Sequence, residues 1–354
     1  MLRPSTPNEI RGWEAGDDCF DISIRVNGFR FTIAVSPGCF IKSPCALQLF
    51  GEIFDKIAAG EDQEPEVWDH AEGIADIFVP EFEKLAPPIL HTGRLTLADL
   101  AVRGSFDCEY RVVEEVSIPG AIMRRTFEDI SPPPDWDMRS LQSSFPIFDP
   151  ADVDVPYSDG RFIYDIIPRQ VSIKGKTVFY KSCWSPYDAV EEVEKYARIY
   201  ASGMPTQQLS TSRLFGIVAD KNGQTKGLLY DWIETEGTGT LTSAINADTP
   251  VSLREKWASQ IRSAVAGLHS LGVIWGDAKP DNVLIDMDNN AVVIDLEGGT
   301  TREWVDRDVG NTVAGDLQGL NRLIDFIFND EHPLRLSHES GEGHSDGSIQ
   351  DDIP

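Results

Sequence analysis

The sequence predicts an α+β protein of two domains, and three patterns support this fold class. Asn27-Gly28 stands between two runs of alternating apolar and polar residues, which is a strong signal for a β-hairpin. Apolar residues recur at helical spacing over 252–268 and predict an amphipathic helix. The 354 residues are enough for two domains, because one domain usually spans about 100–200 residues.

The N-terminal region, 1–130, contains both strand and helix patterns. These patterns predict two hairpin strands, two helices and a later strand, at 20–26, 29–35, 47–57, 68–82 and 106–113. Clusters of catalytic residue types are not evident in this region. We therefore expect a small α+β domain of unknown role that packs against the rest of the chain or binds a protein partner.

A proline-rich segment separates this region from the next. Pro132-Pro133-Pro134 makes the chain stiff and extended, so we place a linker at 131–145 and a second domain at 146–328. The acidic segment 329–354 is rich in Gly and Ser, and its composition predicts a disordered tail.

The second domain has a different order of elements. A strand, a turn at Lys174-Gly175 and a second strand come first, over 171–180. Ser252 and Glu255 have the spacing of a capping box and predict the start of a helix. The other predicted elements are a helix over 189–200, strands at 227–233, 283–285 and 291–294, and a helix over 317–327.

The charge of the chain limits its partners. Asp and Glu number 58 against 31 Lys and Arg, for a net charge of −27. This charge repels nucleic-acid phosphates and anionic lipids, so we expect neither nucleic acid nor membrane as a partner. A small molecule, a nucleotide carried with its metal ion, or a basic protein fits better.

The cysteines and the apolar segments indicate the compartment. The five cysteines form an odd set without CxxC spacing, which argues against a disulfide framework or a zinc site. The N-terminus lacks the apolar segment of a signal peptide, and no apolar run is long enough to span a membrane. We therefore expect a cytoplasmic or nuclear protein that is not secreted.

One segment carries a set of residues suited to phosphoryl transfer. Asp277, Lys279 and Asn282 form the pattern Asp-x-Lys-x-x-Asn, and a short hairpin then leads to a strand that ends at Asp295. A carboxylate can orient the attacking hydroxyl, and an ammonium can balance charge on the phosphoryl group. An amide oxygen and a second carboxylate can hold Mg²⁺ against nucleotide phosphates.

This set resembles the catalytic and metal-binding loops of the protein-kinase-like superfamily. It is most similar to the divergent kinase-like proteins of filamentous fungi, and the later segment GDLQGL at 315–320 extends the match. The resemblance covers about 150–328. It implies a kinase-like bilobal fold with a reduced C-lobe, in which the N-lobe spans about 146–233 and the C-lobe about 234–328.

The resemblance also implies roles for single residues in the C-lobe. Asp277 matches the catalytic aspartate, and Lys279 matches its partner lysine. Asn282 and Asp295 match the ligands of Mg²⁺. Asp316 matches an aspartate that braces the catalytic loop. The cofactors implied are ATP and Mg²⁺.

Further matches lie in the predicted N-lobe. Lys181 resembles the lysine that holds nucleotide phosphates, and Glu192 best fits its helical partner. Glu191 and Glu194 remain alternatives for that partner. The residues at the hinge, where backbone groups would bond the adenine, are Asp231, Trp232 and Ile233.

Several features depart from the family pattern. The chain lacks G-x-G-x-x-G, for which Gly160 is a weak substitute, and Trp275 and Gly276 stand where His-Arg would precede the catalytic aspartate. Without that arginine we do not expect control by a phosphorylated activation loop. Asp-Leu-Glu replaces Asp-Phe-Gly, so we expect Leu296 to fill an apolar slot and the loss of glycine to limit backbone freedom.

The interval after Asp295 is also short. Only a brief segment without Ala-Pro-Glu separates Asp295 from Asp316, and the later C-lobe helices are missing. The usual platform for a peptide substrate is therefore not expected. We interpret His269 and Trp275 as packing residues and Glu297 as a solvated charge.

These matches and departures leave three functions open. The first is an Mg-ATP-dependent phosphotransferase that moves the γ-phosphoryl group to a hydroxyl of a protein or a small molecule. The second is a pseudokinase, which acts as a nucleotide-binding or protein-interaction module. The third is transfer of another group, such as a nucleotidyl or acyl group.

Overall fold

The structure is a computed structural model that describes residues 10–16, 18–59, 65–125, 144–158, 160, 163–183, 188–204, 209–301 and 303–335. The chain forms two compact units. The N-terminal unit comprises Pro4–Ser131 and Asp154–Ile167, and the C-terminal unit comprises Met1–Arg3, Pro132–Val153 and Pro168–Pro354. Each unit combines strands with helices, so the chain is α+β, as the sequence predicts.

The N-terminal unit is built on a six-stranded sheet. Its order is β1-β2-β3-β5-β4, with β6 paired to β5. The strands are β1 (Ile10–Ala15), β2 (Phe20–Val26), β3 (Phe29–Val35), β4 (Phe40–Ile41), β5 (Gly104–Val113) and β6 (Val116–Arg125). Asn27 and Gly28 have φ of 48° and 85° in the turn between β2 and β3. The predicted hairpin is therefore confirmed, with Val26 paired to Phe29.

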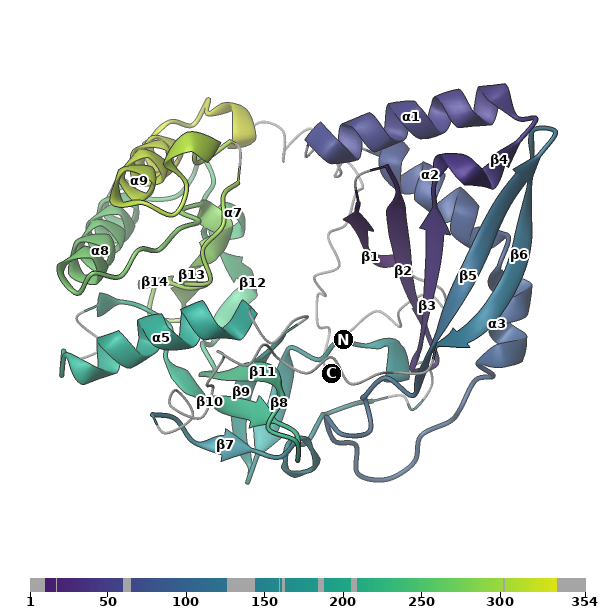
Figure 1. Ribbon diagram of the computed structural model, residues 1–354. Coiled ribbons are helices and arrows are strands. Elements are labelled where there is room, and N and C mark those ends of the chain that lie inside the picture. The colour runs from purple at the N-terminus through teal and green to yellow at the C-terminus, as the bar shows by residue number, and fades with distance from the viewer. Residues whose placement is uncertain are drawn as a thin grey trace. The chain divides into compact units, whose positions relative to one another are not determined.

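Three helices pack on this sheet (Figure 1), namely α1 (Pro44–Ala59), α2 (Pro65–Asp76) and α3 (Val79–Leu85). Alternate side chains of β2 are buried, because side chains along a strand point to opposite faces. Phe20 of β2 stacks on Phe50 of α1, and Phe31 of β3 packs on Phe82 of α3. The helix predicted over 68–82 is divided in two, because a proline in the first turn of α3 cannot continue α2.

The segment Asp154–Ile167 packs within the N-terminal unit, although the sequence places it in the second domain. The N–H of Gly28 donates to Asp165 Oδ1 over 2.9 Å, and the Arg103 guanidinium lies 3.9 Å from the centre of the Tyr164 ring. The polar contacts of this segment therefore hold the hairpin turn of the first unit. Most of the predicted linker, 131–145, lies outside the described residues, as does the tail from 336 onward.

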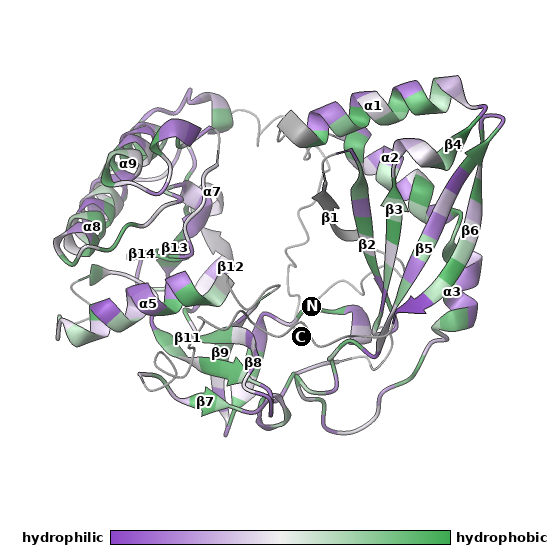
Figure 2. Cartoon of the chain, viewed as in Figure 1, coloured by the Kyte–Doolittle hydropathy of each residue, from purple (hydrophilic) through white to green (hydrophobic). Residues whose placement is uncertain are grey.

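The C-terminal unit begins with a five-stranded sheet in the order β7-β10-β11-β9-β8. The strands are β7 (Ile147–Phe148), β8 (Gln170–Ile173), β9 (Lys176–Ser182), β10 (Leu214–Ala219) and β11 (Thr225–Asp231). The strand β10 is largely hydrophobic (Figure 2), and β11 is largely buried. Lys174 and Gly175 form the predicted turn between β8 and β9, with φ of 50° and 81°.

The rest of this unit is mostly helical and includes a small second sheet. Its helices are α5 (Asp188–Ala201), α7 (Leu241–Ala244), α8 (Val251–Ser270) and α9 (Val313–Phe328). The strands β12 (Thr235–Thr240), β13 (Val283–Asp286) and β14 (Ala291–Val293) form the second sheet. One hydrophobic core joins these parts, since it includes Val193 of α5, Leu228 of β11, Trp257 of α8 and Leu323 of α9.

Two details of the C-terminal unit differ from the prediction. The helix α8 begins at Val251 after Pro250, without a side-chain cap, so the capping box at Ser252 and Glu255 is wrong. Residues 329–335 are ordered rather than part of a tail. The His332 ring stacks on Trp304, and Arg335 is buried. Among the described helices, none combines the length and apolar character needed to cross a bilayer.

Candidate functional site

Lys181 and Glu192 form the first contact of the candidate site. Lys181 lies near the end of β9, and Glu192 lies on the buried side of α5, where its side chain is 1% exposed. The Nζ of Lys181 is 2.8 Å from Glu192 Oε2. Of the three glutamates considered from the sequence, Glu192 is therefore the one that faces Lys181. Glu191 instead pairs with Lys195.

Asp295 joins this pair from the loop after β14. Its Oδ1 is 2.7 Å from the Nζ of Lys181, and its φ of 58° lies in the left-handed region. Aspartate adopts this region more often than most residues, because its short polar side chain can form hydrogen bonds to nearby backbone groups. Burial opposes the charged form of Lys181, but Glu192 and Asp295 outweigh that effect and raise the pKa of Lys181 above its ordinary value.

Glu192 also contacts the main chain of the Asp295 loop. Its Oε1 accepts a hydrogen bond from the N–H of Leu296 over 3.3 Å. Burial raises the pKa of Glu192, and Lys181 only partly offsets this rise. The ion pair with Lys181 and the bond from Leu296 thus compensate a carboxylate that is almost fully removed from water.

A second group of contacts surrounds Asp277. The Nζ of Lys279 is 2.7 Å from Asp277 Oδ2, and the Nδ2 of Asn282 donates to the same oxygen over 3.2 Å. The other oxygen, Oδ1, accepts a hydrogen bond from the hydroxyl of Thr301 over 2.9 Å. Lys279 also donates to the Thr301 hydroxyl. Asp277 is therefore held in one orientation, and Thr301 is a member of the site that the motif did not reveal.

The hairpin of β13 and β14 brings Asn282 toward Asp295. Val283 pairs with Val293, and the N–H of Ile294 donates to the carbonyl oxygen of Asn282 over 3.0 Å. Asn282 thus stands opposite the residue that precedes Asp295. Within the described residues, the side-chain oxygen of Asn282 accepts no hydrogen bond. An amide oxygen and a carboxylate are hard donors of the kind that Mg²⁺ prefers, so these residues fit that ion.

Asp316, in the first turn of α9, holds the loop that leads to Asp277. Its side chain is fully buried and accepts hydrogen bonds from the N–H groups of Trp275 and Gly276, over 2.8 and 2.7 Å. His269 Nε2 lies 2.7 Å from the same carboxylate, so His269 does more than pack at a helix end. Trp275 is fully buried, as expected of a packing residue.

The loops of Asp277 and Asp295 approach each other at two glycines. Gly276 and Gly298 both have φ of 97°, and a Cβ on Gly276 would lie 2.5 Å from the Cα of Gly298. A larger residue at position 276 would therefore force these loops apart, whereas a Cβ on Gly298 would lie 2.7 Å from Oδ1 of Asn311. The glycine missing from the Asp-Leu-Glu motif is thus replaced one position later, by Gly298. Leu296 is fully buried and fills an apolar slot, as predicted.

Glu297 is not a freely solvated charge, and this corrects the prediction. Its Oε2 lies 2.7 Å from the Nζ of Lys181, although the side chain is 40% exposed. Sequence patterns do not indicate this contact, since it depends on the turn of the loop after Asp295.

The predicted hinge residues lie at the end of β11 and directly after it. Asp231 ends that strand, and its carboxylate pairs with Lys176 over 2.6 Å, at the opposite end of β9 from Lys181. Trp232 is exposed, and Ile233 is half-buried. These are side-chain contacts, and they do not test whether backbone groups of the hinge bind adenine. That role stays a prediction.

Gly160 does not lie in the sheet that carries Lys181. It belongs to the N-terminal unit, where its carbonyl oxygen accepts a hydrogen bond from His91. A Cβ at Gly160 would lie 2.2 Å from the His91 carbonyl oxygen, so close packing accounts for this glycine. These contacts give no support to its suggested role as a phosphate-binding glycine, which stays a prediction.

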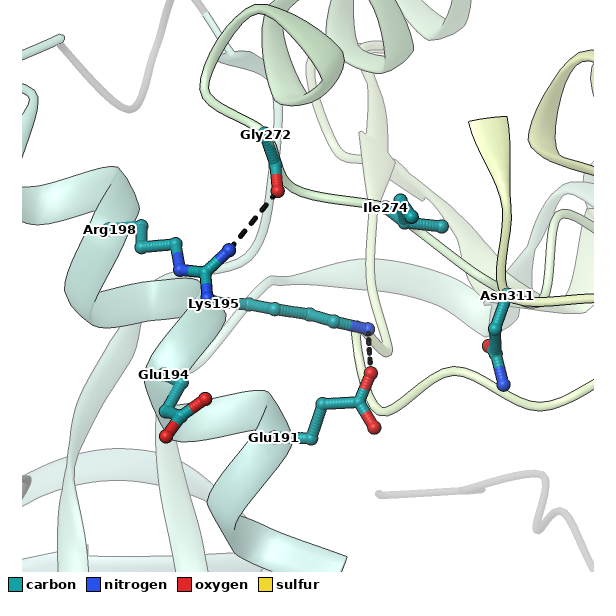
Figure 3. A pocket seen from close by; sticks show the side chains of 7 residues that line it. All are labelled: Glu191, Glu194, Lys195, Arg198, Gly272, Ile274 and Asn311. Carbon is teal, nitrogen blue, oxygen red and sulfur yellow. Dashed lines mark hydrogen bonds and ion pairs between the residues drawn. The ribbon is translucent and has the colours of Figure 1, made fainter. Parts of the chain in front are cut away.

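A polar pocket lies beside α5 (Figure 3), and residues of that helix and of the segments around Gly272 and Asn311 line it. Its wall includes Lys195, which contacts Glu191, and Arg198, which donates to the carbonyl oxygen of Gly272. Lys181, Glu192, Asp277, Asn282 and Asp295 do not line this pocket, but Glu191 and Glu194, the alternatives to Glu192, do. Lys195 connects the pocket wall to the Asp295 loop, because its Nζ also donates to the carbonyl oxygen of Leu296.

Comparison with known proteins gives a partial match. No family profile matches the chain. Over 93 residues, the chain is 42% identical to a Dictyostelium discoideum protein named as a probable serine/threonine-protein kinase. The match covers 26% of this chain and only 4% of that protein. A kinase-like relationship is thus supported for part of the chain, and the resemblance to fungal proteins stays a prediction.

Proposed function

We propose that the C-terminal unit is an Mg-ATP-dependent phosphotransferase of the protein-kinase-like superfamily. In this proposal the five-stranded sheet and α5 form the N-lobe. The helices α8 and α9, with the small second sheet, form a reduced C-lobe. The observation that carries the proposal is the contact of Lys181 with both Glu192 and Asp295, from three elements far apart in the sequence.

Each residue has a chemical task in this proposal. Lys181, held by Glu192, would bind the nucleotide phosphates. Asn282 and Asp295 would hold Mg²⁺, which neutralises charge on the phosphates when it is bound. Asp277 would orient the acceptor hydroxyl, and Lys279 would offset charge on the phosphoryl group during its transfer. The hydrogen bonds of Asp277 to Thr301 and Asn282 support this task, because they fix the direction of its carboxylate.

The acceptor is a hydroxyl of a protein or of a small molecule. The short interval between Asp295 and Asp316 leaves little chain for gripping a peptide, which favours a small molecule. The N-terminal unit is proposed to bind a protein partner, since its described residues include no group of His, Cys, Asp or Glu that could hold a metal ion.

A pseudokinase is the second candidate, and a specific observation favours it. The ammonium of Lys181 already contacts three carboxylates. In addition, the described strands include no glycine-rich hairpin next to β8 that would surround phosphates. In this alternative the unit binds a nucleotide or a protein without transferring a phosphoryl group. Transfer of a nucleotidyl or acyl group is a third possibility that no contact favours.

A thermal-shift titration with ATP tests the proposal, with and without Mg²⁺. The variants are Asp295→Ala and Lys181→Ala, beside the unchanged chain. A ligand that binds only the folded state stabilises it by about 2.7 kcal/mol at a hundredfold excess over Kd. We expect an Mg-dependent shift that both variants lose, followed by slow ATP hydrolysis or transfer to an acceptor. A shift without turnover would favour the pseudokinase, and no shift at millimolar ATP would refute nucleotide binding.

A further inference from the structure

The ammonium of Lys181 is surrounded by carboxylates of this chain. Its Nζ lies 2.8 Å from Glu192 Oε2, 2.7 Å from Asp295 Oδ1 and 2.7 Å from Glu297 Oε2. A lysine ammonium has three N–H donors and no acceptor. Each donor of Lys181 is therefore matched by one carboxylate, and a phosphate oxygen that approaches Lys181 must replace one of them.

The three carboxylates differ in how firmly they are held. The Glu192 side chain is 1% exposed and also binds the N–H of Leu296. Asp295 is fixed by its place next to the β13–β14 hairpin and is the proposed Mg²⁺ ligand. Glu297 is 40% exposed, and within the described part of the chain Lys181 is its one ion-pair partner. Glu297 is therefore the carboxylate that can leave at the smallest cost.

The charges around Lys181 also favour the departure of Glu297. Three carboxylates around one ammonium leave an excess of negative charge, which repels a polyphosphate. Departure of Glu297 lowers this excess and frees one donor of Lys181. We propose that Glu297 occupies the position at Lys181 that a nucleotide phosphate oxygen takes, so that it competes with the nucleotide and sets its affinity. This inference rests on the proposed function, because it assumes that Lys181 binds phosphate.

A different role for Glu297 makes the opposite prediction. Oxygen atoms of Glu192, Asp295 and Glu297 lie within 4.8 Å of one another, a spacing that a single cation can bridge. If Glu297 helped to hold Mg²⁺, its removal would weaken binding of Mg-ATP. The direction of the change in affinity therefore separates competition from metal binding.

The test is Glu297→Gln in the full chain, which keeps the shape of the side chain and removes its charge. The matched control is Glu303→Gln, which makes the same change in charge at an exposed position nearby. Calorimetric titration measures the Kd of Mg-ATP and of adenosine for both variants and the unchanged chain. We expect Glu297→Gln to lower the Kd of Mg-ATP about two- to fivefold, the range of a partly exposed ion pair. Adenosine, which has no phosphate, should bind equally to all three proteins.

Every other outcome would refute the inference, and each would lead to a different conclusion. Equal Kd values for Mg-ATP in the unchanged chain and in Glu297→Gln would refute competition and leave the proposed function standing. Weaker binding by Glu297→Gln would assign Glu297 to the metal instead. No binding of Mg-ATP by either protein would refute the proposed function together with this inference. A gain of the same size in Glu303→Gln, or for adenosine, would show a general effect of charge and would also refute it.

Discussion

Lys195 donates a hydrogen bond from its Nζ to the main-chain carbonyl oxygen of Leu296, over 2.8 Å. Glu192, three residues earlier on the same face of α5, accepts the N–H of Leu296. The helix thus binds both main-chain polar groups of the residue that follows Asp295. Because Leu296 is also fully buried, the position of Asp295 depends on the position of α5.

These two hydrogen bonds clamp Leu296 to α5, so we predict that Lys195→Met loosens the Asp295 loop. Lys195 is almost fully buried, and methionine keeps the length of the side chain but cannot donate to Leu296. Loss of a hydrogen bond from a charged donor costs about 1.5–3 kcal/mol. We expect the free energy of unfolding in urea to fall by that amount, and the Mg-dependent thermal shift with ATP to weaken.

The matched control for this substitution is Arg198→Met on the same helix. Arg198 is more exposed and donates to Gly272 over a longer distance, 3.3 Å. This variant should lose less than about 1 kcal/mol and should keep the thermal shift with ATP. If both variants lose the same stability and keep the shift, Leu296 is not clamped as described.

Asp316→Asn should destabilise the loop that carries Asp277. The carboxylate of Asp316 uses both oxygens to accept main-chain N–H groups, from Trp275 and Gly276. Asparagine has one oxygen, so one of these buried N–H groups would face an NH₂ group. We expect the free energy of unfolding to fall by about 2–4 kcal/mol in urea denaturation. Asp325→Asn, at an exposed position of the same helix, should change it by less than about 0.5 kcal/mol.

Much of the fold follows from short-range patterns in the sequence. The turns at Asn27-Gly28 and Lys174-Gly175 are predictable because they require positive φ at both residues, which few residue types allow. Helix boundaries are harder to predict. Ser252 has the right spacing for a cap, but α8 already begins at Val251, after Pro250. The buried Arg254 binds carbonyl oxygens of the preceding turn.

The candidate site is predictable only where a regular element sets the spacing. Strand β9, helix α5 and the β13–β14 hairpin bring Lys181, Glu192 and Asp295 together, and each has a residue type that the motif requires. The contacts of Thr301 and Glu297 could not be predicted, because they depend on the path of the loop after Asp295. The packing of Asp154–Ile167 with the N-terminal unit was not predictable for a similar reason. It depends on the contact between the Asp165 side chain and the distant turn at Gly28.

Thr301→Val tests the role of the unpredicted hydroxyl. Valine has nearly the same shape but cannot donate to Asp277 or accept from Lys279. If Asp277 orients the acceptor hydroxyl, loss of this support should lower kcat about tenfold or more, with little change in the Kd of ATP. Thr301→Ser should restore most of the rate. Thr300→Val, at the exposed neighbouring position, should leave kcat unchanged, and an equal loss there would contradict a specific role for Thr301.

The cysteines of the N-terminal unit should differ sharply in reactivity. Cys108 is 2% exposed in β5, and burial, with a smaller effect of Asp107, raises its pKa to about 12. Its thiolate fraction at pH 8 is then only about 10⁻⁴. Cys45 is exposed at the start of α1. Iodoacetamide at pH 8 should therefore modify Cys45 in minutes and leave Cys108 intact until urea unfolds the unit, as mass spectrometry of peptides can measure.

The raised pKa of Cys108 also makes the stability of the folded chain depend on pH. Folding raises the pKa of Cys108 above its value in the unfolded chain, about 8.5, so the folded state holds the proton more tightly. Its contribution to stability is complete below about pH 8.5 and is lost as the pH rises from there toward 12. The urea midpoint should thus decline between pH 8.5 and 10, and the decline should be smaller in Cys108→Ala. Identical declines in the two proteins, or rapid labelling of Cys108 in the folded chain, would contradict its burial.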